Sequence, residues 1–277
     1  MSAKKGPEPK LAILGGGNIG RAIARGLVGA GRLAAGQIVI TRRSPEALED
    51  LSREGYRIQS DNADAVRRCE IVLLAVQPQQ IVDLLREIRS ELSPRKHLLV
   101  SIVSGVGCAD IARSVGKKVA VVRAMPNTAV AIRESMTCLA SNLAPPAAME
   151  RVRSLFDALG RTLVISEEQM IPATALCACG IAFFLRCIRA ASQGGIEIGF
   201  HSDEALLLAA QTAKGAAALL VSAEHHPEAE IDKVTTPRGC TIAGLNEMEH
   251  QGLSSALIKG ILTSADKAGK LFVASRE

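Results

Sequence analysis

The first 165 residues alternate short apolar runs with helical patterns, and this alternation limits the possible folds more than any other feature of the chain. Strands that are apolar along their whole length, separated by amphipathic helices, are typical of a parallel sheet covered on both faces. The sequence therefore predicts an α/β domain. The apolar runs are "LAILG" (11–15), "QIVIT" (37–41), "EIVLLAV" (70–76), "HLLVSIV" (97–103), "KVAVVRAM" (118–125) and "SMTCLAS" (135–141).

The pattern changes after residue 165, where helical periodicity continues without a convincing strand. Ser166 to Gln169 has the composition of a capping box, which satisfies free backbone N–H groups where a helix begins. We therefore predict a flexible N-terminal tail over residues 1–9, an α/β domain over 10–165 and an all-helical domain over 166–277.

Two segments of the helical half, 181–193 and 205–221, are apolar on almost every face. A small helical domain cannot cover such helices alone, so we expect a homodimer built through this half. Gln211, Thr212 and Lys214 interrupt the second segment, and a membrane span needs about 20 mostly apolar residues. The sequence therefore favours an interface helix, and no membrane partner is expected.

The glycine-rich turn "GGGNIG" (15–20) stands directly between the first strand and the first helix. Its spacing, G-x-G-x-x-G, permits a tight turn, close approach of the backbone to a pyrophosphate, and close packing of the helix on the strand. A Rossmann-type dinucleotide-binding domain is the predicted fold, and a purely structural turn is the alternative. The expected cofactor contacts in this turn are Gly15, Gly17, Asn18, Ile19 and Gly20.

The end of the second strand indicates which dinucleotide is bound. An NAD-preferring site usually has Asp or Glu there to bind the ribose hydroxyls, whereas this chain has Thr41, Arg42, Arg43 and Ser44. Guanidinium and hydroxyl groups suit a 2′-phosphate, and no carboxylate is present to repel it. We predict NADPH as the cofactor, with a solvated basic turn as the alternative reading.

Two further strand ends are predicted to contact the cofactor, because ligands of such sheets bind beyond the carboxyl ends of the strands. Ordinary turn chemistry is the alternative, since Pro and Asn are common in turns. The residues assigned to the cofactor are Ala75, Val76, Gln77, Pro78, Met125, Pro126 and Asn127.

Charge and composition narrow the class of ligand. Residues 1–164 carry a net charge of +9 and the remainder −4, which together give the +5 of the whole chain. A basic half suits nucleic acid or a small anion, but 2% aromatic residues and no Trp leave little for base stacking. We expect a small anionic ligand and no nucleic acid. Seven cysteines without an apolar leader indicate a reducing, cytoplasmic compartment.

With these motifs placed, the chain resembles the pyrroline-5-carboxylate reductase family from about Lys10 to Leu271. The resemblance implies a Rossmann domain followed by an all-helical dimerisation domain, sometimes assembled into a ring of dimers. It also implies NADPH-dependent reduction of the cyclic imine 1-pyrroline-5-carboxylate to proline, the last step of proline biosynthesis. The segments that carry it include "GGGNIGRAIARGL", "AVQP", "SIVSGV", "RAMPNTA", "AAQTAKGAAALL" and "VTTPRGCTIAGLNEMEHQGL".

The same resemblance implies a substrate loop between Thr236 and Thr241. The backbone N–H groups of Gly239, Cys240 and Thr241 would receive the substrate carboxylate, helped by the Thr236 hydroxyl. Thr241 would hydrogen-bond the ring nitrogen. A glycine-bearing loop that opens a helix offers bare N–H donors, which suit a carboxylate as they suit a phosphate.

The chain departs from the family pattern in two places. Cys177-Ala178-Cys179-Gly180 replaces S-G-S-G, and Arg238 and Cys240 replace Gly and Thr of the substrate loop. Cys177 and Cys179 are expected to line the mouth of the site, with metal or disulfide chemistry as the lesser reading. Arg238 either reinforces the carboxylate site or points to solvent.

These departures leave two other functions open, a reductase of another cyclic imino acid and a weakly active NADPH-binding paralogue. Hydroxyacid dehydrogenases of this architecture use a lysine on a helix of the helical domain. Lys214 is the nearest candidate for it, but its surroundings resemble the reductases. His225-His226-Pro227 reads as an exposed loop rather than a metal site, and His97 and His201 as structural residues. No metal is expected.

Overall fold

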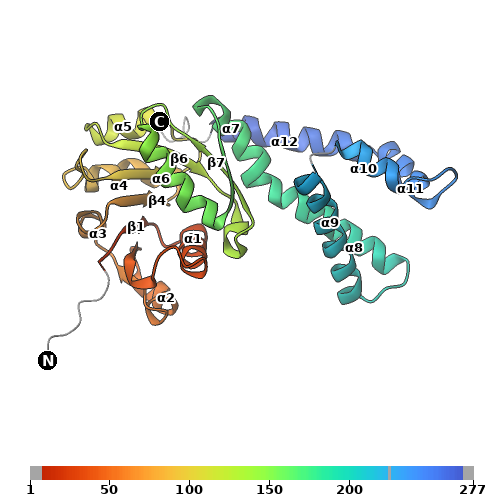
Figure 1. Cartoon of the computed structure of the whole chain (residues 1–277), viewed down its shortest axis with the longest axis horizontal. Coiled ribbons are helices and arrows are strands. Elements are labelled where there is room, and N and C mark those ends of the chain that lie inside the picture. Colours follow the sequence, from red (N-terminus) through yellow and green to blue (C-terminus); the bar gives the residue numbers. More distant parts are fainter. Residues whose placement is uncertain (1–7, 224–225, 271–277) are drawn as a thin grey trace. The chain divides into compact units, whose positions relative to one another are not determined.

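The structure is a computed structural model that describes residues 8–223 and 226–270 (Figure 1). The chain divides into two compact units, one from residues 1–179 and 264–277 and one from residues 180–263. Most of the predicted tail, residues 1–7, lies outside the described residues, as does His225 of the histidine-containing loop.

The first unit contains an eight-stranded sheet in the order β3-β2-β1-β4-β5-β6-β7-β8. Every neighbouring pair is parallel except β6 and β7, which are antiparallel. The predicted α/β fold with a largely parallel sheet is confirmed. The strands are β1 (Leu11–Leu14), β2 (Ile38–Thr41), β3 (Arg57–Gln59), β4 (Ile71–Leu74), β5 (Leu98–Ser101), β6 (Ala120–Met125), β7 (Ser135–Ala140) and β8 (Gly160–Val164).

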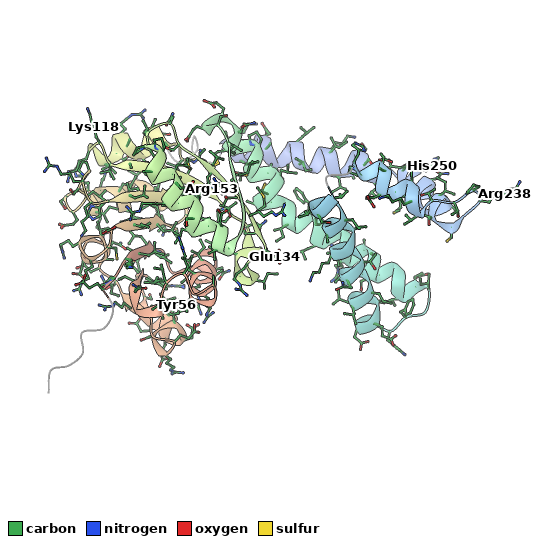
Figure 2. The ribbon with its side chains drawn as sticks, in the orientation of Figure 1. Tyr56, Lys118, Glu134, Arg153, Arg238 and His250 are labelled. Carbon is green, nitrogen blue, oxygen red and sulfur yellow. The ribbon has the colours of Figure 1, made fainter. Side chains whose placement is uncertain are left out.

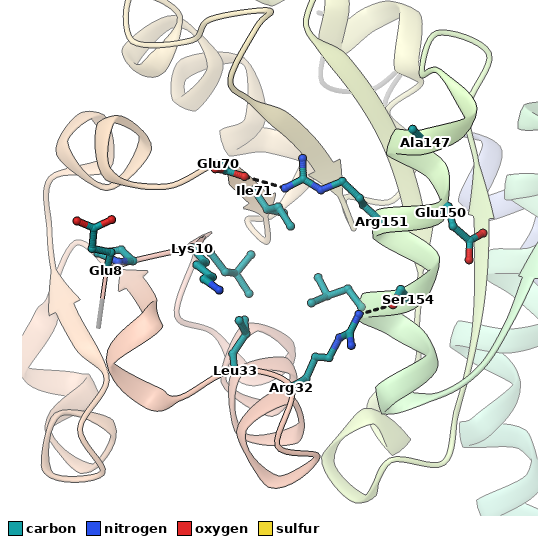
Figure 3. A pocket seen from close by; sticks show the side chains of 13 residues that line it. Glu8, Lys10, Arg32, Leu33, Glu70, Ile71, Ala147, Glu150, Arg151 and Ser154 are labelled. Atoms are coloured by element: carbon teal, nitrogen blue, oxygen red, sulfur yellow. Dashed lines mark hydrogen bonds and ion pairs between the residues drawn. The ribbon is translucent and has the colours of Figure 1, made fainter. Parts of the chain in front are cut away.

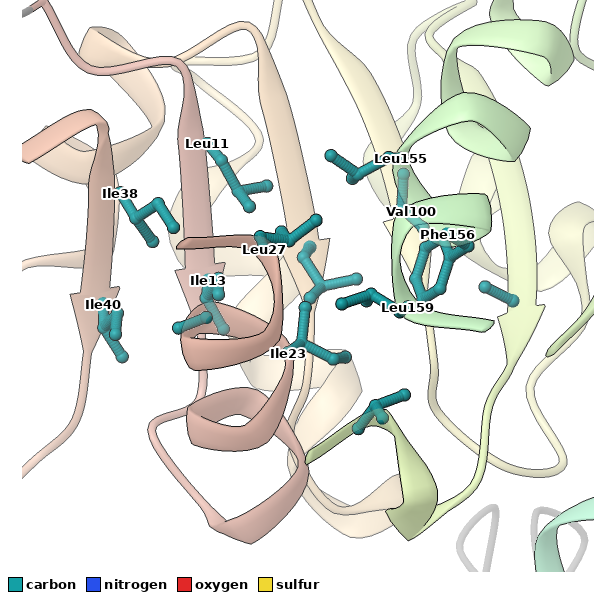
Figure 4. Packing of buried hydrophobic residues seen from close by; sticks show 14 of the residues in the cluster. Leu11, Ile13, Ile23, Leu27, Ile38, Ile40, Val100, Leu155, Phe156 and Leu159 are labelled. Carbon is teal, nitrogen blue, oxygen red and sulfur yellow. The ribbon is translucent and has the colours of Figure 1, made fainter. Parts of the chain in front are cut away.

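Helices cover both faces of the sheet, and β1 shows why its residues are apolar along the whole strand. Leu11 and Ile13 pack on one face in a cluster with residues of α1 and α6 (Figure 4). Ala12 and Leu14 pack on the other face in a second cluster, with residues of α3, α4 and α5. The helices are α1 (Asn18–Gly29), α2 (Glu49–Arg53), α3 (Asn62–Arg68), α4 (Ile81–Ile88), α5 (Cys108–Val115) and α6 (Pro146–Phe156).

After β8 the described chain is helical. A short helix, α7 (Met170–Ala173), leads into a π-helical turn, Thr174–Cys179, at the end of the first unit. The later helices are α8 (Gly180–Glu197), α9 (Ser202–Ala223), α10 (Pro227–Val234), α11 (Cys240–His250) and α12 (Leu253–Lys270). The domain boundary predicted at 165/166 differs from this division into compact units, because the first turns after β8 pack with the sheet domain.

The second unit exposes many large apolar side chains. Leu207 on α9 is 69% exposed and Phe184 on α8 is 61% exposed. Monomeric soluble proteins rarely leave such surfaces uncovered. Two helical stretches, Glu167–Glu197 and Ser202–Ser222, are also long and apolar enough to cross a membrane by length and composition, which on its own is weak evidence.

Candidate active site

The three glycines of the G-x-G-x-x-G motif between β1 and α1 have different structural roles. Gly15 has a φ of +121°, and a Cβ on it would collide with the Ala75 carbonyl. A Cβ on Gly20 would collide with the Gly15 carbonyl oxygen. A Cβ on Gly17 would meet nothing within 4 Å. Packing therefore requires glycine at Gly15 and Gly20, whereas Gly17 keeps the backbone open to an incoming group.

The N-terminus of α1 is suited to receive an anion. Gly17 is the N-cap residue, and the described residues supply no side-chain hydrogen bond to the first turn and no acidic side chain within it. The first N–H groups of a helix lack intrahelical partners and carry partial positive charge. The turn therefore fits the pyrophosphate of a dinucleotide, which Asn18, Ile19 and Gly20 would meet through their backbone.

The residues after β2 lie next to this turn. The Arg42 guanidinium donates to the Gly16 carbonyl with 3.0 Å between Nη1 and O. The Thr41 side chain turns inward: it is 1% exposed, and its hydroxyl donates to Asn62 Oδ1 at 2.6 Å. Arg43 is exposed, without an ion pair among the described residues. The Arg42 guanidinium is therefore placed at the surface beside the glycine turn, Arg43 is exposed at the next position, and the Thr41 hydroxyl is buried.

The ends of β4 and β6 reach the same edge of the sheet, because β2, β1, β4, β5 and β6 run parallel. Ala75 follows β4, and its N–H donates to the Leu14 carbonyl at 2.9 Å. Asn127 follows β6, where its side chain accepts from the Ala129 N–H (3.0 Å) and donates to the Cys177 carbonyl (3.3 Å). The structure thus brings the loops predicted to contact the cofactor, 15–20, 41–43, 75–78 and 125–127, to one edge.

The loop before α11 is a tight turn. The Gly239 N–H donates to the Thr236 carbonyl at 2.9 Å, with Pro237 second in the turn and Arg238 third. Arg238 has a φ of +60° and an exposed side chain (Figure 2). Proline second and a positive φ third are features of a type II turn, which favours glycine at the third position. The turn therefore has the positive φ that favours glycine, with arginine in that position.

The same turn leaves the start of α11 open. A Cβ on Gly239 would collide with the Thr236 hydroxyl, which lies over the beginning of the helix. Among the described residues, no side chain caps α11. Since the Gly239 N–H is used within the turn, the donors that remain for a carboxylate are those of Cys240 and Thr241. Cys240 is exposed and Thr241 is half-buried.

Comparison with known proteins decides the family. Residues 167–271 match a family model described as pyrroline-5-carboxylate reductase dimerisation, and residues 10–105 match one described as NADP oxidoreductase, coenzyme F420-dependent. Pyrroline-5-carboxylate reductase 2 of Dictyostelium discoideum is 48% identical over 276 residues, which cover 94% of this chain and 92% of the relative. The chain belongs to the pyrroline-5-carboxylate reductase family.

Two further comparisons agree with this family. Pyrroline-5-carboxylate reductase 1 of the same organism is 53% identical over 279 residues, 96% of this chain, and the chain spans half the length of that relative. The crystal structure of Plasmodium falciparum pyrroline carboxylate reductase with NADP bound superposes with a TM-score of 0.87. It is 23% identical and covers 96% of this chain and 100% of that chain, so it supports the fold alone. The expected fold and family are both confirmed.

The two cysteines that replace serines lie on the π-helical turn Thr174–Cys179, and one of them has a partner that sequence reasoning missed. The Cys177 sulfur is 3.8 Å from the sulfur of Cys138 on β7. The sequence placed Cys138 inside a strand, but only the fold brings that strand against the turn. In residues 8–223 and 226–270, no group of three His, Cys, Asp or Glu side chains is arranged to hold a metal ion.

A cavity of about 780 Å³ lies elsewhere on the sheet domain, at the amino ends of β1 and β4 (Figure 3). Lys10, Arg32 and Arg151 line it, and Arg151 forms an ion pair with Glu70 at 2.9 Å. Ligands of parallel sheets bind at the carboxyl ends of the strands. This cavity lies at the opposite edge from the glycine turn and is not part of the candidate active site.

Proposed function

We propose that the chain reduces 1-pyrroline-5-carboxylate to proline, the last step of proline biosynthesis, with NADPH as the hydride donor. The reaction rests on family membership, which makes the chain an oxidoreductase of the NAD(P)-dependent class that acts on CH–NH groups. The proposal of a dinucleotide cofactor rests on the open turn at Gly17, where the backbone of α1 can approach a pyrophosphate. A bound nicotinamide supplies a hydride to the imine carbon.

NADPH rather than NADH is proposed from the residues after β2. Arg42 is anchored to the Gly16 carbonyl beside the glycine turn, and Arg43 extends from the next position. Guanidinium groups recognise phosphate through paired N–H donors, which the free ribose hydroxyls of NADH cannot exploit as well. The second strand carries no carboxylate at its end that would favour NADH instead.

The test of this preference is the ratio of kcat/KM for NADPH to that for NADH. Arg42→Ala should lower the value for NADPH and leave the value for NADH nearly unchanged. Arg53→Ala is the matched control, because Arg53 is an exposed arginine of the nearby α2 that pairs only with Glu49 on its own helix among the described residues. A wild-type chain that uses NADH as well as or better than NADPH would overturn the proposed preference.

The substrate is proposed to bind at the start of α11. The N–H groups of Cys240 and Thr241 would receive the carboxylate, with the Thr236 hydroxyl beside them. The Thr241 hydroxyl would hold the ring nitrogen. An imine is already electrophilic, so the main task of these groups is to hold it in position for hydride transfer.

Arg238 extends from the turn just before these donors and is proposed to reinforce the carboxylate site. Replacement by alanine should then raise the KM for the imine and leave the KM for NADPH unchanged. Cys177 and Cys179 are proposed to border the substrate, as sequence comparison with the family suggested. The two alternative functions, reduction of a different imino acid and a weakly active paralogue, are not favoured by the relatives named above.

The helical half carries a dimerisation domain, which supports formation of a homodimer or larger homo-oligomer. We propose a homodimer formed through this half, assembled further into a ring of dimers. The exposed apolar side chains of α8 and α9 suit an interface between copies, so we propose no membrane partner. Few aromatic side chains are present for base stacking, so we propose no nucleic-acid partner. Light scattering of the purified protein measures the number of subunits directly.

Two further assignments stay proposals. The division into domains at 165/166 is proposed because the dimerisation family model begins at residue 167. The cytoplasm is proposed as the compartment, in keeping with seven cysteines that are all free.

A further inference from the structure

Two cysteines that are 39 residues apart in the sequence meet in the sheet domain, with 3.8 Å between their sulfur atoms. Cys138 lies on β7 and is 4% exposed, and Cys177 lies on the π-helical turn and is half-buried. Their surroundings are a small apolar cluster that includes Met125, Met170 and Ala173. A disulfide needs about 2 Å between sulfurs, so each sulfur would have to move by about 1 Å.

The two thiols differ in acidity and in access. The two sulfurs share a hydrogen bond in which either thiol can be the donor. With Cys138 as the donor it stabilises a Cys177 thiolate, and this lowers the pKa of Cys177 to about 7. That hydrogen bond, together with burial, raises the pKa of Cys138. Thiolates react with oxidants and thiols do not, so Cys177 is the more reactive of the two at neutral pH. Burial raises the pKa of both Cys69 and Cys108 to about 12, which makes them unreactive.

We propose that Cys138 and Cys177 are an oxidation-sensitive pair that closes to a reversible disulfide when a hydroperoxide reaches Cys177. The Cys177 thiolate attacks the terminal peroxide oxygen, the O–O bond breaks, and a sulfenic acid forms as the peroxide is reduced to water or an alcohol. Cys138 then loses its proton and attacks the Cys177 sulfur. The S–S bond forms, the S–O bond breaks, and the hydroxyl group leaves with that proton as water.

The first step makes the second step easier. Two of the causes that raise the pKa of Cys138 are its hydrogen bond to Cys177 and the negative charge there. Conversion of the Cys177 thiolate to a neutral sulfenic acid eliminates that charge, so Cys138 ionises more easily once its partner is oxidised. A dithiol reductant reverses the disulfide by thiol–disulfide exchange.

The disulfide would hold the π-helical turn against β7 next to a proposed cofactor contact. The Cys177 carbonyl accepts from the Asn127 side chain at 3.3 Å. A shift of the turn therefore moves a partner of Asn127, and we expect the oxidised protein to lose reductase activity. This consequence rests on the proposed function, whereas formation of the disulfide does not.

The test treats the full-length protein with hydrogen peroxide, blocks free thiols with iodoacetamide and maps tryptic peptides without reduction. The expected product joins peptide 134–151 to peptide 162–186 and is lighter than their sum by about 2 Da, the two hydrogens removed. Since the second peptide contains both Cys177 and Cys179, the link should persist in Cys179→Ser and vanish in Cys177→Ser and Cys138→Ala.

Activity is the second readout. Peroxide should remove most of the turnover of the wild-type protein, and dithiothreitol should restore it. Cys138→Ala should keep its turnover under the same treatment.

A link between Cys177 and Cys179, stable oxidation of Cys177 without a link, or no reaction at either residue would each overturn the proposal. A Cys138–Cys177 link with full turnover would overturn its regulatory part. If no imine is turned over at all, the proposed function fails, and the peptide map still decides the disulfide.

Discussion

Arg123 on β6 and Glu167 form a buried ion pair with 3.1 Å between Nη1 and Oε1. Glu167 lies in the first helical turn after β8. Their side chains are only 5% and 17% exposed. The same carboxylate oxygen accepts from the N–H of Cys108, the first residue of α5, at 3.0 Å. One carboxylate therefore ties a central strand, a covering helix and the beginning of the helical half together.

Removal of the charge at Glu167 is expected to destabilise the fold strongly. In Glu167→Gln the Arg123 guanidinium stays buried without a counter-charge, and two of its nitrogens already lack partners among the described residues. Breaking a buried pair in this way costs about 3–5 kcal/mol. Urea unfolding measures this free energy. Glu70→Gln, which breaks the exposed pair with Arg151, is the matched control and should change stability by less than about 1 kcal/mol. Equal effects of the two substitutions would contradict the account.

Two alanine substitutions separate packing from cofactor binding in the glycine turn. Gly20→Ala should destabilise the fold, because its Cβ meets the Gly15 carbonyl. Gly17→Ala should leave thermal stability unchanged, because its Cβ meets only open space and its φ of −80° suits alanine. NADPH binding to Gly17→Ala should weaken by about tenfold, or about 1.4 kcal/mol, because the methyl group occupies the approach of the pyrophosphate. Unchanged affinity, measured by fluorescence titration, would refute this placement.

Replacement of Arg238 by glycine should stabilise the protein. A φ of +60° strains an L-residue by about 1–2 kcal/mol, and glycine adopts it freely but loses more chain entropy on folding. A net gain of about 1 kcal/mol is expected from urea unfolding. Arg238→Ala removes the same charge but keeps a Cβ in the strained position, so it should give no such gain. If both variants stabilise equally, charge and not backbone strain is responsible.

Buried His97 should make the fold sensitive to mild acid. Its Nδ1 accepts from the Ser93 N–H at 2.8 Å and its Nε2 lies 3.1 Å from the Val66 carbonyl, which together suit the neutral ring with its proton on Nε2. Burial lowers the pKa of His97 below its usual 6.5. Below that pH the unfolded chain binds a proton that the folded chain resists, so stability is lost as the pH falls.

Thermal unfolding at pH 7.5 and 5.5 measures this loss. The drop in Tm should be smaller in His97→Gln than in the wild-type protein. An identical drop in both proteins would show that other groups control the response to acid.

The features that sequence predicted well are local ones. The glycine turn depends on the spacing of Gly15, Gly17 and Gly20 beside one strand and one helix, and this spacing is visible in six consecutive residues. The sheet follows from apolar runs whose residues pack on both faces. The edge strand β3 has only three residues and two of them are polar, so it does not produce such a run. The sequence also does not show that β6 and β7 pair antiparallel, because apolar runs do not reveal strand direction.

Contacts between distant segments could not be predicted. The Cys138–Cys177 pair requires the register of β7 against a π-helical turn, and the Arg123–Glu167 pair requires a strand to meet a turn 44 residues later. In the substrate loop, the resemblance to the family implied three N–H donors for the carboxylate. It did not show that the Gly239 N–H is used inside the turn, because that depends on the conformation of Arg238.

The most direct test of the account is the initial rate of NADPH oxidation by the purified chain with 1-pyrroline-5-carboxylate and with its six-membered analogue. We expect rapid turnover of the five-membered imine, slower turnover of the analogue, and a kcat for Thr241→Ala that falls far more than its affinity for NADPH. NADPH binding without turnover of any cyclic imine would contradict the proposed function.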